Sequence, residues 1–551
     1  MAERLGQDLD GMSRRAMLKY LGIGGVLLSA SPFALAACTS DKGTGGSTGA
    51  ATGSTSGGSG TGGTVALQTG VREVAFDPID PHLSANGVTI NLMWYVYEAL
   101  YVGGIANPTT FTPQLAAAQP TQVDPTTYKV TLRSGAKFQD GTPVTADDVV
   151  FSFNRIIGLG EKSFLQKYLL NFDKVTATGT DEVTFTLKKP TPLFVQRVAT
   201  VRIMSKAKVS GAKATDPILN YQPIGSGPYQ VTSADPTSGA KMSAFAGYNG
   251  PFKSSVAASA IDMNIITDAN ARVSALQSGA VDAITAPPST SVANLKSSGS
   301  SVAAPTGLST HLFFVNAKSK PFNDPRVIQA AMYAMDRAAI AQVAYSGYAT
   351  AAEALVPSTN NDYTQPSTTY AHDPNKAKQL LAAAGYPNGL SFELQVGTED
   401  ANQVAAGQLI QAQLADAGFK VNIRQGDTAG LYTRVTNGAY QAMYTGTSPA
   451  LLGSADAEFV YRWLYYGAFV QQYVYWTTAQ ATQVAQLLDQ AVSATSNDQY
   501  KTIMAQVIDL CAQYGPVQPV VHPSPVYAWN TSKTAAITPA PVGDLILARN
   551  V

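Results

Sequence analysis

Residues 39–64 form a segment that cannot build a core, and this segment divides the chain. Of its 26 residues, 22 are Gly, Ser or Thr, and none is large and apolar. Such a composition has no apolar surface to bury, so we expect a flexible coil with an r.m.s. reach of ~30 Å. About 490 residues follow it, enough for roughly two to four ordinary domains. The fold must therefore be sought after residue 64, and residues 1–38 need a separate explanation.

The chain begins with features of an export signal. Ser13, Arg14 and Arg15 precede an apolar stretch at 20–37 that contains three glycines and a proline. This arrangement resembles a twin-arginine export signal, and the stretch is too short and interrupted for the roughly 20 apolar residues of a spanning helix. Met17 stands where the twin-arginine pattern often has Phe. The pattern therefore indicates export more strongly than it indicates the route.

The apolar stretch ends in Leu35-Ala36-Ala37-Cys38, which resembles a bacterial lipobox. In that motif the small residues admit a peptidase, and the cysteine thiol takes the lipid. We therefore expect residues 1–37 to be a cleaved signal peptide and Cys38 to be lipidated. Residues 38–64 would then tether an exported protein to the outer face of the cytoplasmic membrane. The alternative is a chance LAAC sequence.

The charge balance excludes partners that bind through a broad electrostatic field. The 37 Lys and Arg residues equal the 37 Asp and Glu residues, and charged residues make up 13% of the chain. We therefore expect no nucleic-acid binding. The two cysteines and four histidines provide neither a CxxC pair nor an HExxH helix, so we expect no cofactor and no Cys/His metal site, whereas a carboxylate site stays open. A lipidated Cys38 would leave Cys511 without a disulfide partner.

After the tether, the sequence alternates between strand and helix patterns. Residues 128–133 and 183–187 alternate apolar and polar side chains, which predicts strands. Thr145 and Asp148 have the spacing of a capping box, so Asp147 and Asp148 are expected to begin a helix rather than to act as an acid–base pair. Further helix starts are predicted at the Asp-Pro pairs 324–325 and 373–374, and a helix end at Gly385.

These elements carry a specific resemblance. Residues 128–153 read YKVTLRSGAKFQDGTPVTADDVVFSF, which resembles the signature stretch of bacterial extracellular solute-binding proteins of family 5, the receptors of ABC importers for peptides and nickel. Other motifs follow in the family's order: VYEAL at 96–100, VTFTLKKPTP at 183–192, GSGPY at 225–229, ALQSG at 275–279, FVN at 314–316, PFNDPRVIQAAMYAMDR at 321–337 and DPNKAKQLLAAAGYPNG at 373–389. The resemblance covers roughly residues 70 to 530.

The resemblance implies an α/β, bilobal periplasmic-binding-protein-like fold, of type II and like cluster C, with an extra domain inserted in the first lobe. By motif position, lobe one would comprise 65–100, 220–310 and 515–551. The inserted domain would comprise 101–219, and lobe two 311–514. Two lobes of this kind close on a ligand by hinge motion. The expected function is capture of a small solute, an oligopeptide or peptide-like compound, by a monomer that delivers it to a membrane permease and its ATPase.

The resemblance also indicates where a ligand would bind. Peptide-binding members carry an acidic residue for the ligand's amino group in a segment like W-x-A-D-Y-x-x-P. Here Thr447 stands near the expected Trp, and Asp456 arrives several residues late, so the alternative for Asp456 is a solvated acid in a loop. The candidate ligand-binding residues are Asp456, Tyr444, Thr447, Ser448, Arg462, Trp463, Tyr465, His82 and Asn86. Ser84 lies between the last two in the sequence and is a further candidate.

An unusual aromatic segment follows Asp456. Nine of the 18 residues at 459–476 are Phe, Tyr or Trp, against 9% in the whole chain. Such a segment either packs a core or stacks on sugar rings or peptide side chains in a cleft. Arg462 within it could bind a carboxylate through two hydrogen bonds, or lie on the surface.

Other functions need separate consideration. No G-x-S-x-G elbow follows a strand pattern and opens a helix pattern, and no metal-ligand cluster supports catalysis, so we expect no enzyme. A site made of His311, a serine and Asp324 stays open from the sequence. An oligosaccharide receptor of the same fold and a ligand-sensing lipoprotein without transport are the remaining alternatives.

Overall fold

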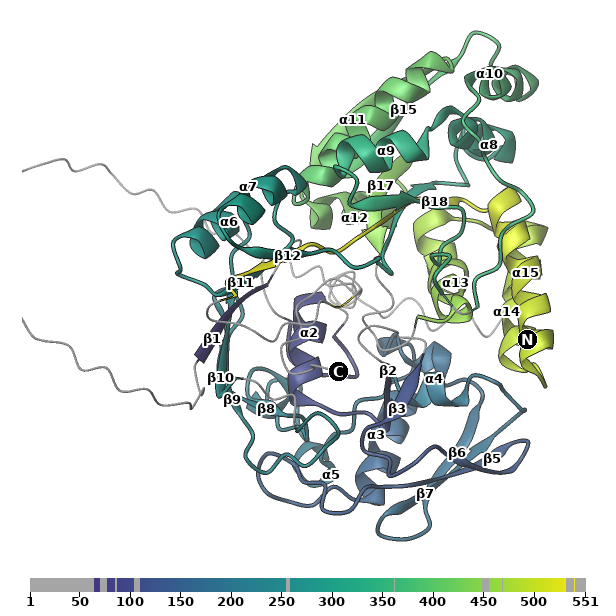
Figure 1. The fold of residues 1–551 in the computed structure, drawn as a ribbon. Coiled ribbons are helices and arrows are strands. Elements are labelled where there is room, and N and C mark those ends of the chain that lie inside the picture. Colours follow the sequence, from purple (N-terminus) through teal and green to yellow (C-terminus); the bar gives the residue numbers. More distant parts are fainter. Residues whose placement is uncertain are drawn as a thin grey trace, which may run out of the picture.

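A computed structural model describes residues 64–69, 77–84, 87–103, 110–253, 258–360, 362–447, 455–467, 469–531 and 540. The predicted signal peptide, Cys38, Asn86 and Ser448 lie outside these residues. The described chain forms two large mixed sheets and a smaller four-stranded sheet, surrounded by helices (Figure 1). In the described part, no helix has the length and apolar content needed to cross a bilayer.

The first large sheet combines distant parts of the chain. In spatial order its strands are β12 (Ser301–Ala303), β19 (Tyr527–Trp529), β11 (Ala283–Thr285), β1 (Thr64–Thr69), β10 (Ala260–Ile265), β9 (Gly239–Ala244) and β8 (Tyr229–Asp235). β1 runs parallel to both β10 and β11, and the other pairs are antiparallel. Helices α2 (Gly87–Val96), α6 (Ala269–Gln277) and α7 (Val292–Ser297) belong to the same region.

The second large sheet lies at the top of Figure 1. Its strands, in spatial order, are β14 (Ala349–Ala351), β18 (Val517–Pro523), β13 (Thr310–Val315), β17 (Ala442–Thr447), β15 (Leu390–Gly397) and β16 (Phe419–Gly426). The helices of this region are α8 (Pro325–Ala334), α9 (Arg337–Ala344), α10 (Pro374–Ala383), α11 (Ala401–Asp416), α12 (Thr428–Thr436), α13 (Ala457–Tyr465), α14 (Ala479–Val492) and α15 (Asn497–Tyr514), with a π-helix at Val470–Val474.

The position of β18 departs from the predicted lobe boundary. The prediction assigned 515–551 to the first lobe, but β18 pairs with β13 and β14 in the second sheet. Its residues Val517–Val521 are buried between these two neighbours, which stabilises β18 there. The chain returns to the first sheet only at β19, where it pairs with β11 and β12.

The small sheet is formed from a continuous part of the chain. Its order is β4 (Thr121–Asp124), β5 (Thr127–Thr131), β7 (Glu182–Leu187) and β6 (Phe172–Ala177), and every pair is antiparallel. Nearby elements are β2 (Tyr101–Gly103), β3 (Phe111–Pro113), α3 (Ala146–Leu159), α4 (Phe194–Val198), α5 (Lys206–Val209) and the 3₁₀ turn η2 (Gln166–Tyr168). This sheet has its own buried core, and it falls within the segment 101–219. The residue bounds of the lobes and the assignment of an inserted domain stay predictions.

The structure confirms the helix starts and the helix end that were predicted from short stretches of sequence. Asp148 accepts hydrogen bonds from the Thr145 backbone and hydroxyl at the start of α3, which completes the capping box. Asp324 and Asp373 cap α8 and α10. Gly385 follows α10 with a φ of +92°, a left-handed conformation that favours glycine.

Three of the sequence motifs meet at one point. A Cβ atom on Gly225 would lie 1.9 Å from the Val96 carbonyl oxygen, so the backbones can approach this closely only with glycine at 225. The Gly227 amide donates to that same carbonyl at 2.8 Å. Gln139 accepts from the Gly225 amide at 2.9 Å and donates to the Tyr229 carbonyl at 2.7 Å. The motifs at 96–100, 128–153 and 225–229 therefore meet in one close, hydrogen-bonded backbone contact.

Candidate functional site

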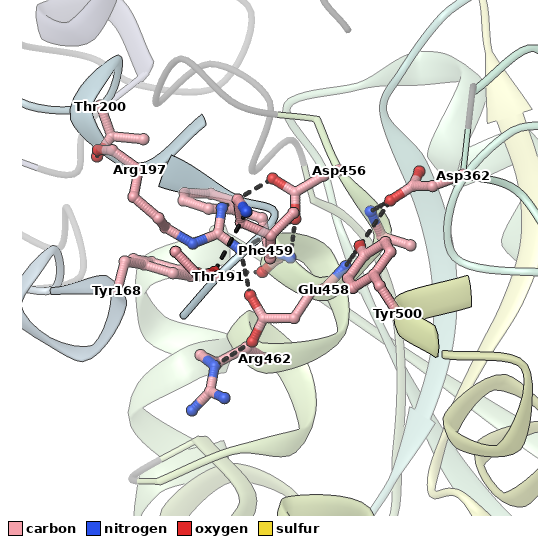
Figure 2. A network of polar contacts seen from close by, with 12 residues as sticks. Tyr168, Thr191, Arg197, Thr200, Asp362, Asp456, Glu458, Phe459, Arg462 and Tyr500 are labelled. Atoms are coloured by element: carbon pink, nitrogen blue, oxygen red, sulfur yellow. Dashed lines mark hydrogen bonds and ion pairs between the residues drawn. The ribbon is translucent and has the colours of Figure 1, made fainter. Parts of the chain in front are cut away.

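The residues around Asp456 form a charged contact between distant parts of the chain. Asp456 is the N-cap of α13, and its Oδ1 accepts from the Phe459 amide at 2.9 Å. Arg197 of α4 donates to both of its oxygens, from Nη1 to Oδ2 at 2.8 Å and from Nη2 to Oδ1 at 3.1 Å. Figure 2 shows Arg197 extending toward Asp456 and Glu458. This contact joins α4 to α13 although 259 positions separate the two residues.

The charges at this contact are buried and paired. Arg197 is 2% exposed, and it also binds Glu458, which is fully buried. Glu458 in turn binds Arg462, and Arg462 contacts Asp489 at 3.1 Å. Burial lowers the pKa of Arg197, but the charges of Asp456 and Glu458 outweigh burial and hold that pKa above its ordinary value. Each buried charge therefore has an opposite partner, as burial requires.

Aromatic rings pack around this ion pair. Tyr168 of η2 stacks on Phe459 with ring centroids 3.9 Å apart, and its hydroxyl donates to the Phe459 carbonyl at 3.1 Å. The Arg197 guanidinium lies 5.7 Å from the Tyr168 ring and 5.6 Å from the Phe459 ring. The rings exclude water from the ion pair, which strengthens its electrostatic attraction.

A small cavity lies beside this contact. It is lined by Pro81, Ser84, Ile90, Met93, Phe164, Leu165, Thr200 and Arg202. Its volume of about 20 Å³ has room for a water molecule but not for a peptide. Phe164 also contacts Trp463 of α13, with ring centroids 5.9 Å apart, so the cavity wall adjoins the contact between η2 and α13.

Two of the predicted residues lie near these features. The Nε2 atom of His82 is 2.9 Å from the Arg202 carbonyl oxygen, and its neighbours Pro81 and Ser84 line the cavity. Burial, followed by the charge of Arg155, lowers the pKa of His82 to about 4, so its ring is neutral at pH 7. Trp463 is half-buried, with Lys167 Nζ 4.4 Å from its ring centroid.

The other predicted residues lie in structural positions. Tyr444 is buried in β17, where its hydroxyl lies 2.9 Å from that of Tyr345. Thr447 ends β17 opposite Thr310. Tyr465 is buried and donates to the Val517 carbonyl at 2.5 Å. Arg462 is buried against Glu458, so the alternative of a surface arginine is wrong.

Asp456 is 7% exposed, so the alternative of a solvated loop acid is also wrong. Its expected role toward a ligand ammonium group stays a prediction, as do the ligand-binding roles of the other candidate residues. Most of the aromatic segment packs a core, because Phe459, Tyr461, Tyr465, Tyr473 and Trp476 are all buried.

Sequence reasoning missed the residues that face α13 and the cavity. Arg197 and Arg202 are both nearly fully buried, in the apolar stretch LFVQRVATVRIM at 193–204. Two arginines within an apolar stretch could have indicated buried ion pairs, because a buried arginine needs a partner. Lys167 lies in η2 and Phe164 in the turn before it, and neither carries a comparable pattern.

The two mixed sheets are linked by crossing segments, and α4 and η2, beside the small sheet, contact α13 of the second region. This arrangement is that of the bilobal periplasmic binding proteins. The family model "Bacterial extracellular solute-binding proteins, family 5 Middle" matches residues 110–470. The chain belongs to this family.

Known relatives agree with this assignment. The glutathione-binding protein GsiB of Escherichia coli O157:H7 is 31% identical over 393 residues, which cover 69% of this chain and 74% of GsiB. The dipeptide-binding protein of Pseudoalteromonas sp. SM9913, solved with Met-Leu, superposes with a TM-score of 0.76 at 21% identity over 88% of this chain and 99% of that chain. AgaA of A. tumefaciens R10, solved with agropinic acid, has a TM-score of 0.73 at 24% identity over 88% and 96% of the two chains. These two structures share the bilobal fold.

Proposed function

We propose that this protein is the solute receptor of an ABC importer and that its solute is a peptide or a peptide-like compound. The family match across residues 110–470 carries this proposal. Relatives of that family are named for glutathione or were solved with a dipeptide, which supports a peptide-like solute. A receptor of this kind binds and releases its solute without converting it, so the proposal includes no catalytic step.

The solute would enter beside the contact between α13 and the segment 164–202. The cavity next to that contact has room for no more than a water molecule. Because α13 and the segment 164–202 touch through Arg197 and Tyr168, the proposal requires these two sides to separate when a solute enters. Contacts that a solute makes to both sides would then favour reclosure. Asp456 remains the candidate partner for a ligand ammonium group, which would have to compete there with Arg197.

The proposed location follows from the N-terminal sequence. Lipidation at Cys38 and a tether at 38–64 would hold an exported receptor near the outer face of the cytoplasmic membrane. Tethering raises the effective concentration of the receptor at its permease. A monomer suffices for this task, because one chain contains both sides of the proposed site.

The proposal is tested by ligand-induced stabilisation of the full-length protein, purified in detergent. The probes are pools of di- and tripeptides, reduced glutathione, oligosaccharides and nickel–histidine complexes. A bound solute raises the melting temperature by mass action, so at least one peptide-like probe should do so. If oligosaccharides alone stabilised the protein, its proposed solute would be a sugar and not a peptide. If no probe stabilised it, the receptor function would be contradicted. Uptake of the bound probe in cells, lost on deletion of the gene, separates an importer from a sensor.

A further inference from the structure

Arg197 provides the ion pairs that cross the contact between α4 and α13. Among the described residues, it makes both of the ion pairs that connect the segment 164–202 to α13, one with Asp456 and one with Glu458. The other ion pairs of these residues join groups that lie on the same side of the contact. Figure 2 shows the guanidinium of Arg197 extended toward the two carboxylates. The ion-pair attraction between the two sides therefore depends on one side chain.

Helix α13 does not need Arg197 in order to form. Its first three backbone amides are capped from its own side of the contact: Ala457 N–H donates to Asp362 at 2.7 Å, Glu458 N–H to the Tyr500 hydroxyl at 3.3 Å and Phe459 N–H to Asp456 at 2.9 Å. Glu458 also keeps Arg462 as an ion-pair partner within the helix. If Arg197 moved away, α13 and its acids would therefore stay in place.

The closed contact would be unfavourable without Arg197. Asp456 is 7% exposed. Burial, followed by the negative charge of Asp456, raises the pKa of Asp362 to about 6, which indicates that the two carboxylates repel each other. A buried carboxylate that loses its counter-ion is strongly destabilised unless water reaches it. Arg197 therefore favours the closed contact, and its removal favours separation of the two sides.

A solute and this closed contact exclude each other. The adjoining cavity has room for a water molecule but not for a solute, and the rings of Tyr168 and Phe459 stack directly on each other beside the ion pair. Entry of a solute at the proposed place therefore requires Arg197 to release Asp456 and Glu458. The apparent affinity for a solute falls with the fraction of the protein that is ready to bind it.

We propose that Arg197 acts as an internal competitor of the solute: it binds the two acids of α13 while the protein is empty, and solute binding displaces it. This inference rests on the proposed function, and it gives Arg197 control over solute affinity without requiring that Arg197 touches the solute. Replacing a purely structural arginine would lower stability and leave binding equal or weaker. Replacing an internal competitor lowers stability and strengthens binding.

Binding by the full-length protein in detergent separates these two roles. Reduced glutathione and a pool of di- and tripeptides are titrated against wild type and Arg197→Gln, and native mass spectrometry identifies the peptides that bind. Arg197→Gln should bind such a probe roughly threefold or more tightly, although its urea midpoint falls. Arg197→Lys keeps the charge but not the paired hydrogen bonds to Asp456, so it should give a smaller gain. Arg424→Gln removes an exposed arginine whose ion pair stays on one side of the contact, and this matched control should bind as the wild type does.

The outcomes of this titration separate the inference from the proposed function. Equal or weaker binding by a folded Arg197→Gln protein would overturn the inference and leave the receptor function standing. If an oligosaccharide bound in place of peptides, the proposed solute class would be wrong, and the same comparison with that sugar would decide the role of Arg197. If no probe bound either protein, the receptor function and this inference would both be contradicted.

A second measurement needs no solute. Trp463 is half-buried at this contact, against Phe164 and Lys167, so separation of the two sides exposes it. Its quenching by acrylamide is obtained as the difference between each protein and the same protein carrying Trp463→Phe. Arg197→Gln should raise the quenching of Trp463 in the empty protein, whereas Arg424→Gln should leave it unchanged. Unchanged quenching in Arg197→Gln would mean that the empty protein stays closed without Arg197, which would overturn the inference.

Discussion

Arg197 and Asp456 form a two-point ion pair that joins helix α4 to the N-cap of helix α13, and both side chains are buried. The same aspartate caps α13, so one carboxylate both begins the helix and binds a segment far away in the sequence. Disturbing this pair changes the contact on which the proposed site depends.

Arg197→Met should destabilise the protein by about 3–5 kcal/mol, the cost of leaving one member of a buried ion pair alone. The urea midpoint measures this change. Arg197→Met combined with Asp456→Asn should lose less than the two single variants summed, because the double variant leaves no unpaired buried charge. Arg424→Met, which removes an exposed partner of Glu393, is the control and should change stability by less than about 1 kcal/mol. A strictly additive double variant would mean that the two residues do not interact in solution.

Features that depend only on residues close by in the sequence, such as helix caps, could be predicted from the sequence. The caps at Asp324 and Asp373 were predictable because the side chain bonds its own helix. The overall fold was predictable because several motifs occurred together in the family's order. Arg197 was missed because its partner is 259 positions away, and the place of β18 was missed because Val517–Val521 is equally compatible with either buried sheet until its pairing with β13 is known.

The pH dependence of stability should include a contribution from Asp362. Burial, followed by the negative charge of Asp456, raises the pKa of Asp362 to about 6, although its carboxylate accepts from the Ala457 amide and the Tyr500 hydroxyl. The folded protein therefore holds this proton more tightly than the unfolded chain does. Stability from this group is present below pH 4 and is lost as the pH rises to about 6, by roughly 1–3 kcal/mol.

Unfolding by urea at several pH values from 4 to 7 checks this prediction. Asp362→Asn keeps an oxygen acceptor for Ala457 and Tyr500 but does not titrate, so the difference in stability between variant and wild type should grow in the variant's favour across this range. A constant difference would mean that Asp362 has an ordinary pKa in the folded protein.

Cys38→Ala should abolish lipidation if the lipobox assignment is correct. The variant should move from the detergent phase to the aqueous phase in detergent partitioning, because a lipid chain contributes about 0.8 kcal/mol of membrane affinity for each buried CH₂ group. Cys511→Ala is the control, since that buried thiol belongs to the folded body. Unchanged partition of the Cys38 variant would contradict the assignment.

Gly307 lies on one of the two segments that cross between the large sheets, after β12 and before β13. A Cβ atom there would lie 1.8 Å from the carbonyl oxygen of Pro523, which begins the other crossing segment. Gly307→Ala must therefore push the two crossing segments apart, at a cost of roughly 1–3 kcal/mol by comparison with overpacked sites. Because these segments connect the two sides of the proposed binding site, the variant should also change the affinity for whichever probe binds the wild type. Gly158→Ala is the matched control, since nothing lies within 4 Å of its Cβ position near the end of α3. That control should be neutral or stabilising by up to about 1 kcal/mol. If Gly307→Ala were as stable as the control and bound the probe with wild-type affinity, the crossing segments would not be tightly apposed in solution.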